Sequence, residues 1–214
     1  MSTPAFSFQS FEQMPLIGIL RKMPLPSLLK MTEIYARSGF TTLEVTMNSP
    51  GASEMIQMLA EKFPQLNVGA GTVCTLEDLE AALQAGASFI VTPILDEGVI
   101  AAAKASGAIV FPGAFTPTEV YRAWQAGADM VKLFPAGRLG PSYLKDLLAP
   151  LDQLKLIPVG GISLDNFTEF LHAGASGLGL GSQLFPRELI EQGRWDKLEQ
   201  HFQAFSDKYQ AYKS

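Results

Sequence analysis

The chain has 214 residues and a formal net charge of −5 at pH 7, with 47% hydrophobic and 17% charged residues. So high an apolar share with so few charges excludes a disordered or fibrous protein. Lysine and arginine form no run or stripe, so we expect no nucleic-acid partner. The length, without a linker or a shift in composition, predicts one domain over residues 1–214.

The sequence predicts neither a membrane span nor an export signal. The longest uncharged stretch, 170–186, contains His172, two serines and several glycines, and is too polar to cross a bilayer. The first residues lack the basic and apolar regions of a signal peptide, and Cys74 has no second cysteine to pair with. We therefore expect no membrane partner, a cytoplasmic location, and Cys74 as a small buried side chain.

A short sequence pattern recurs along the chain: a glycine follows a serine or alanine at the end of an amphipathic stretch and precedes an apolar run. A glycine just past a helix can adopt the left-handed conformation that closes the last turn, so each copy predicts a helix end that leads into a strand. The glycines of the five copies are Gly39, Gly86, Gly107, Gly127 and Gly174.

The repeat predicts eight strands that alternate with helices, which is typical of a parallel sheet buried on both faces. We expect an α/β fold, a single-domain (β/α)8 TIM barrel with an N-terminal helical segment and C-terminal helices from about residue 183. A doubly wound open sheet is the alternative, although no Gly-x-Gly-x-x-Gly follows the first strand. The predicted strands are 16–20, 42–46, 67–71, 89–92, 108–111, 130–133, 156–159 and 177–180.

Lys132 is the most informative residue, because it lies within the apolar sixth strand. In a barrel, catalytic groups stand at the carboxyl ends of the strands. One interpretation is a structural lysine that forms a salt bridge or extends its ammonium to solvent. The other is an amine whose pKa falls through desolvation and which forms a Schiff base with a ketone. The predicted position at a barrel mouth favours the second interpretation.

Glu44 is predicted to face the same interior, because Leu43 and Val45 alternate with it toward the helices. Glu44 and Lys132 could form a structural ion pair. Alternatively, Glu44 moves the protons that a Schiff-base reaction requires, with the iminium as electron sink. The only histidines are His172 and His201, and no cluster has metal-ligand spacing, so we expect no metal and no cofactor.

Glycines follow the seventh and eighth predicted strands, where barrels commonly bind phosphate through backbone N–H groups. Gly160-Gly161 and Gly181-Ser182 are the two pairs, although Gly-Gly is also typical of a tight turn. Arg21, at the end of the first strand, is either a surface arginine or a ligand for a substrate carboxylate.

Several of these segments resemble the 2-keto-3-deoxy-6-phosphogluconate (KDPG) and 4-hydroxy-2-oxoglutarate (KHG) aldolases, over nearly the whole chain. The most specific segment is residues 127–136, GADMVKLFPA, which is similar to the Schiff-base lysine signature, and the sequence LEVT at 43–46 is similar to the glutamate segment. The resemblance implies that Lys132 forms the Schiff base and Glu44 transfers protons. It also implies that Thr72 and Pro93 line the substrate site, that Gly160, Gly161, Gly181 and Ser182 hold the phosphate, and that the protein is a homotrimer.

The chain departs from the gluconate type after the glutamate, where Thr-Leu-Arg is replaced by Thr46-Met47-Asn48. The sequence Asn48-Ser49-Pro50 is more similar to the 6-phosphogalactonate branch. We expect a phosphorylated keto-acid substrate and pyruvate as small-molecule partners; the expected substrates are 2-keto-3-deoxy-6-phosphogluconate or its galactonate epimer, and 4-hydroxy-2-oxoglutarate. The alternatives are another phosphate-binding barrel enzyme, similar to thiamin-phosphate synthase, and a non-catalytic sugar-phosphate binding protein.

Overall fold

The computed structural model describes residues 5–214 and shows an α/β fold. All strand pairings in this part of the chain are parallel, as the alternation of strands and helices predicted. The strands are β1 (Leu16–Leu20), β2 (Thr42–Thr46), β3 (Asn67–Gly71), β4 (Phe89–Val91), β5 (Ile109–Phe111), β6 (Gly113–Ala114), β7 (Val131–Leu133), β8 (Leu156–Pro158) and β9 (Leu178–Leu180).

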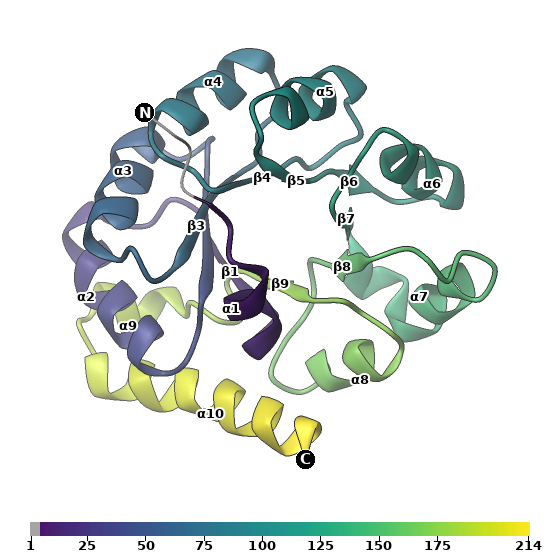
Figure 1. The fold of residues 1–214 in the computed structure, drawn as a ribbon. Coiled ribbons are helices and arrows are strands. Elements are labelled where there is room, and N and C mark those ends of the chain that lie inside the picture. The colour runs from purple at the N-terminus through teal and green to yellow at the C-terminus, as the bar shows by residue number, and fades with distance from the viewer. Residues whose placement is uncertain (1–4) are drawn as a thin grey trace.

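Most helices lie around the outside of the strands, α1 lies in the middle of the view, and α10 runs along one side of the molecule (Figure 1). The predicted N-terminal helical segment and C-terminal helices are present. The helices are α1 (Phe8–Gln13), α2 (Leu25–Arg37), α3 (Ala52–Lys62), α4 (Leu76–Gln84), α5 (Glu97–Ala105), α6 (Pro117–Gln125), the 3-10 helix η1 (Ala136–Arg138), α7 (Gly140–Leu148), α8 (Phe167–His172), α9 (Arg187–Glu191) and α10 (Trp195–Lys213).

The strands form two sheets where the sequence predicts one continuous barrel. Six strands pair in the order β5-β4-β3-β2-β1-β9, and three pair in the order β6-β7-β8. The fifth predicted strand, 108–111, corresponds to β5, and β6 lies beyond its predicted end, after Pro112, which has no N–H to donate to a sheet. At the other junction, Val159 forms an isolated parallel bridge with Gly179. The sheets therefore adjoin at both ends.

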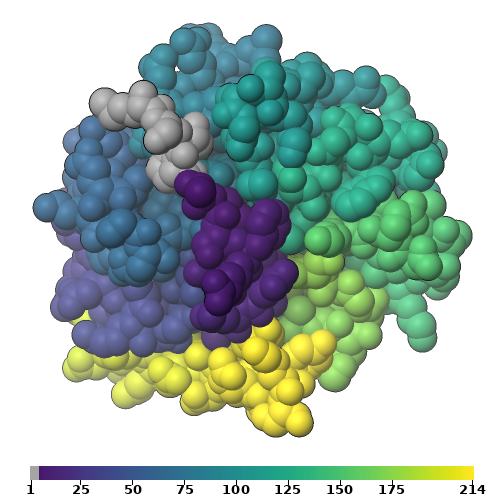
Figure 2. Space-filling view, viewed as in Figure 1, coloured from purple at the N-terminus to yellow at the C-terminus, as the bar shows by residue number. Residues whose placement is uncertain are grey.

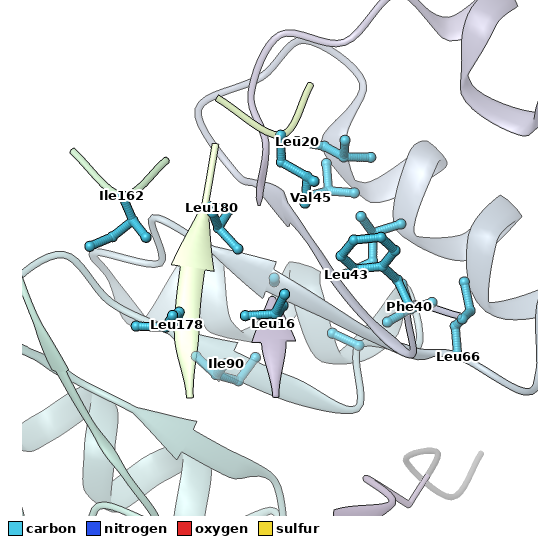
Figure 3. Packing of buried hydrophobic residues seen from close by; sticks show 14 of the residues in the cluster. Leu16, Leu20, Phe40, Leu43, Val45, Leu66, Ile90, Ile162, Leu178 and Leu180 are labelled. Carbon is cyan, nitrogen blue, oxygen red and sulfur yellow. The ribbon is translucent and has the colours of Figure 1, made fainter. Parts of the chain in front are cut away.

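The buried hydrophobic residues form two clusters, an outer and an inner one, and strands such as β1 and β5 contribute alternate residues to both. The outer cluster lies between the strands and the helices and includes Leu43 and Val45 of β2 and Leu178 and Leu180 of β9, which are labelled in Figure 3. The inner cluster lies among the strands themselves. Its members are Phe11, Ile17, Ile19, Phe89, Val91, Phe111, Met130, Ile157 and Val159. The period-2 alternation of strand side chains accounts for this division.

The amino ends of the strands are covered by the N-terminal segment, which fills the middle of the face shown in Figure 2. Phe11 of α1 is fully buried in the inner cluster. Asn67 holds this segment in place, because its Oδ1 accepts the Ser7 N–H at 2.7 Å and its Nδ2 donates to the Ser7 carbonyl at 3.0 Å. The Ser7 hydroxyl caps α1 by accepting the Ser10 N–H.

The inner cluster is packed closely enough to require a glycine on β3. A Cβ atom at Gly69 would contact the ring of Phe89, which fills the space beside it.

No helix in residues 5–214 combines the length and hydrophobicity needed to cross a membrane.

Candidate active site

The inward face of β2 carries only polar side chains: Thr42, Glu44 and Thr46. Glu44 is 2% exposed and pairs with Ile19 of β1 on one side and Gly69 of β3 on the other. Its carboxylate lies so close to Gly71 that a Cβ atom there would collide with it. The absence of a side chain at Gly71 therefore makes room for the carboxylate.

Lys132 faces inward from β7, because its neighbours Val131 and Leu133 both belong to the outer cluster. The lysine is 6% exposed, and its Nζ lies 5.2 Å from the centre of the Phe134 ring. A cation over an aromatic face is attracted to the ring, so Phe134 helps to hold the amine in place. The predicted inward orientation of Lys132 and Glu44 agrees with the structure.

Burial shifts the pKa values of both groups toward their neutral forms. Desolvation raises the pKa of the Glu44 carboxyl, although the charges of Lys132 and Arg21 act in the opposite direction. Desolvation lowers the pKa of the Lys132 amine; Glu44 opposes this shift and the Arg21 charge adds to it. A neutral amine is a nucleophile and a neutral carboxylic acid is a proton donor, so the pair is suited to acid-assisted attack on a carbonyl.

One oxygen of the Glu44 carboxylate is free to interact with a substrate. Its Oε1 is buried and has no hydrogen-bond partner within the described residues. Buried polar atoms are nearly always paired, and exceptions are frequent at functional sites. A structural ion pair would bring a carboxylate oxygen into contact with the Lys132 amine, and the salt bridges of the described residues include no such pair, so this geometry favours the catalytic interpretation.

Five of the predicted binding residues line one cavity of about 430 Å³. This volume is in the range of small-molecule sites. Phe134 forms part of the wall, and so connects the cavity to the Lys132 amine. The predicted residues are Arg21, Gly160, Gly161, Gly181 and Ser182.

Thr72 and Pro93 do not line this cavity. Thr72 directly follows Gly71 and has φ 56°, a left-handed conformation that costs energy for a β-branched residue. Pro93 lines another hollow, of about 550 Å³, and Phe134 lines both this hollow and the first cavity. Thr72 thus directly follows the glycine against which the Glu44 carboxylate lies, and Pro93 lines a hollow that shares Phe134 with the first cavity.

The cavity also contains residues that the sequence analysis did not single out. Phe134 lines both hollows, and Lys22, Gln183 and Arg187 add polar groups to the first. Phe134 could have been recognised, since it lies two residues after Lys132 on the same face. Lys22 and Gln183 directly follow the predicted residues Arg21 and Ser182, whereas no local signal indicates Arg187, because α9 approaches β1 only through the tertiary fold.

Cys74 is half-buried, so the prediction of a buried side chain is wrong. The residue lies in the turn before α4, where its N–H donates to Asp78 Oδ2 at 3.0 Å. Desolvation and the Asp78 charge raise the pKa of the thiol, which disfavours the reactive thiolate. Across residues 5–214, no group of three or more histidine, cysteine, aspartate or glutamate side chains could hold a metal ion.

A family model described as "Aldolase: KDPG and KHG aldolase" matches residues 9–201, most of the chain, and so defines the protein as an aldolase. More specifically, the chain belongs to the KDPG and KHG aldolase family. The resemblance indicated by its sequence motifs is thereby confirmed.

The relatives include both sugar types. The chain is 35% identical to 2-dehydro-3-deoxy-6-phosphogalactonate aldolase of Escherichia coli, over 81% of this chain and 85% of the relative. It is 33% identical to 2-dehydro-3-deoxy-phosphogluconate aldolase of Pseudomonas aeruginosa, over 87% and 84%. A crystal structure of the Legionella pneumophila KDPG aldolase, with pyruvate captured as a covalent carbinolamine, superposes with a TM-score of 0.85 at 29% identity, covering 92% of this chain and 96% of that one.

Proposed function

We propose that the protein cleaves a 2-keto-3-deoxy-6-phospho sugar acid, of the gluconate or galactonate type, to pyruvate and D-glyceraldehyde 3-phosphate through a Schiff base on Lys132. The observation that carries the proposal is the buried pair of Lys132 and Glu44, with both pKa values shifted toward the neutral forms. Family membership and the carbinolamine of the Legionella relative support the same chemistry.

The reaction begins when the neutral Lys132 amine attacks the C2 carbonyl carbon. Glu44 donates a proton to the departing hydroxyl of the carbinolamine, which leaves as water, and an iminium forms. The resulting Glu44 carboxylate then accepts the proton of the C4 hydroxyl. The C3–C4 bond breaks, its electron pair moves to the iminium nitrogen as an enamine, and the aldehyde departs. Protonation at C3 and hydrolysis release pyruvate and restore the amine.

The cavity supports assignment of the two anionic ends of the substrate. Backbone N–H groups at Gly160, Gly161 and Gly181, with the Ser182 hydroxyl, are suited to a phosphate, because glycines let an anion approach the backbone. Arg21 supplies a guanidinium for the carboxylate. Thr72, which directly follows Gly71, and Pro93 remain proposed substrate-site residues.

Since the iminium is the electron sink, the proposed mechanism uses no metal. The same steps cleave 4-hydroxy-2-oxoglutarate to pyruvate and glyoxylate, which we propose as a second substrate. The cytoplasmic location predicted from the sequence stays a prediction.

Trapping of pyruvate tests this function. We expect borohydride reduction in the presence of pyruvate to add one three-carbon unit to Lys132, located by peptide mass spectrometry. Glu44→Gln should still bind pyruvate but turn over about a hundred- to ten-thousandfold more slowly. Absence of an adduct, or an adduct on another lysine, would indicate a different phosphate-binding enzyme or a non-catalytic binding protein. Kinetics on the two epimers side by side define the preferred sugar.

We further propose that the two sheets close as one eight-stranded barrel. The proposal is supported by the single residue between β5 and β6 and by the bridge between Val159 and Gly179.

A homotrimer is the proposed assembly. Large apolar side chains are exposed on the part of the surface that runs from α4 to α6, and such surfaces favour association. These side chains are Leu76, Ile94, Phe115 and Tyr121. Light scattering coupled to size-exclusion chromatography should give a mass three times the chain mass of 23.2 kDa. A monomer mass would contradict the proposal.

A further inference from the structure

The loop after β1 is connected to the end of β2 by a buried hydroxyl group. The Ser49 Oγ accepts the backbone N–H of Lys22 at 2.8 Å, across 27 residues of sequence. Ser49 is 6% exposed, so water competes little for this hydrogen bond. The contact joins the residue that directly follows Arg21 to the turn that follows β2.

Lys22 has φ 52°, in the left-handed region that non-glycine residues rarely adopt. Such a conformation persists only where surrounding contacts favour it over the ordinary alternatives. The hydrogen bond from its N–H to Ser49 is a contact of this kind. The Lys22 N–H belongs to the peptide group that joins Arg21 to Lys22, so its hydrogen bond to Ser49 also restrains the backbone of Arg21.

Ser49 is itself held in place by β2. Its hydroxyl and that of Thr46 share a hydrogen bond at 2.9 Å, and its N–H donates to the Thr46 carbonyl at 2.9 Å. Thr46 is 1% exposed and stands on the same inward face as Glu44. The turn therefore connects the strand that carries the acid to the loop that carries the arginine.

We propose that Ser49, supported by Thr46, is a positioning residue that orients Arg21 toward the carboxylate of the substrate. Arg21 lines the cavity, and its charge acts on both buried groups of the site. The inference rests on the proposed function, since it assigns Ser49 a part in binding the keto acid. A guanidinium binds a carboxylate best in a bidentate geometry, which makes its orientation important.

The test compares Ser49→Ala with Ser53→Ala, a partly exposed serine one turn further along in α3. We expect Ser49→Ala to raise KM for the keto acid about five- to tenfold, the worth of one buried hydrogen bond, with kcat within about twofold. Thr46→Val, which keeps the side-chain shape, should change KM in the same direction by a smaller factor. Ser53→Ala should leave both constants unchanged.

A double-mutant cycle separates positioning from general loosening of the structure. If Ser49 acts through Arg21, Ser49→Ala should have no further effect on KM in an Arg21→Ala background. If the double variant's KM rises by the product of the two single-variant factors, or if Ser49→Ala has the parental KM, the proposal is overturned. Borohydride trapping at Lys132 in the parent protein distinguishes this failure from failure of the proposed function, since only the latter abolishes the adduct.

Discussion

The two ends of the strands have opposite chemistry. At the amino end, Phe11 and Phe89 fill the interior with apolar side chains that are fully buried. Toward the carboxyl end, Glu44 and Lys132 occupy inward positions and are buried as well, yet they are ionisable. Burial of an aromatic ring stabilises the fold, whereas burial of an amine or a carboxyl costs free energy and changes its reactivity. The amino end should therefore determine stability and the carboxyl end activity.

The largest expected effect is at Lys132. Lys132→Met should lower turnover at least about a thousandfold, because no other group replaces the nucleophile. The free energy of unfolding should stay equal or rise by about 1 kcal/mol, since a desolvated amine is replaced by an apolar side chain of similar length. Steady-state kinetics and denaturant unfolding measure the two quantities.

The control for this substitution is Lys145→Met, at an exposed position of α7. It should leave turnover unchanged. A large loss of stability in Lys132→Met would show that the lysine is mainly structural and would contradict the division between the two ends.

The second prediction concerns the amino end. Phe89→Ala should lower the free energy of unfolding by about 3–5 kcal/mol, because it leaves a cavity in the inner cluster. Turnover per folded molecule should remain near the parental value below the unfolding transition. Phe63→Ala, at a half-buried position after α3, should cost less. If Phe89→Ala kept the parental stability but lost activity, the assignment of stability to the amino end of the strands would be wrong.

The smallest expected effect is a shift in pH dependence. The Arg21 charge lowers the pKa values of both Lys132 and Glu44, so Arg21→Met should raise both. Schiff-base formation requires the neutral amine; its rate rises with pH as Lys132 loses its proton, and this limb should move to higher pH by about one unit or less. Trapping rates measured from pH 5 to about 10, below the ordinary lysine pKa, follow the limb. A shift to lower pH would contradict the assigned contact.

Arg37→Met provides the matched control, since this exposed arginine of α2 binds Glu199 of α10 instead. Its pH profile should coincide with that of the parent protein.

The elements near the site could be predicted from sequence because their signals are local. The five-residue strands β1, β2 and β3 begin and end where predicted, and alternation alone places Glu44 and Lys132 on inward faces. The two sheets were predicted as one, because an apolar run around Pro112 does not show where pairing is interrupted. Thr72 and Pro93 do not line the first cavity, and their place in the substrate site stays a prediction.

The contacts that refine the site were beyond prediction. In the sequence, Gly71 does not differ from other strand glycines, and only the structure shows the Glu44 carboxylate packed against it. The hydrogen bond between Ser49 and Lys22 likewise depends on the pairing of β1 with β2. Such contacts join residues distant in sequence, so the hydrophobic periodicity of the sequence cannot predict them.

The division between strands and loops has a consequence for how such an enzyme acquires new substrates. Lys132 and Glu44 stand within paired strands, whereas Arg21, Gly160 and Ser182 stand in the loops beyond them. Loops tolerate substitution and insertion far better than buried strands do. Laboratory evolution toward another keto acid should therefore accumulate its changes in the loops and retain the two reacting groups, so that one catalytic apparatus serves a succession of specificities.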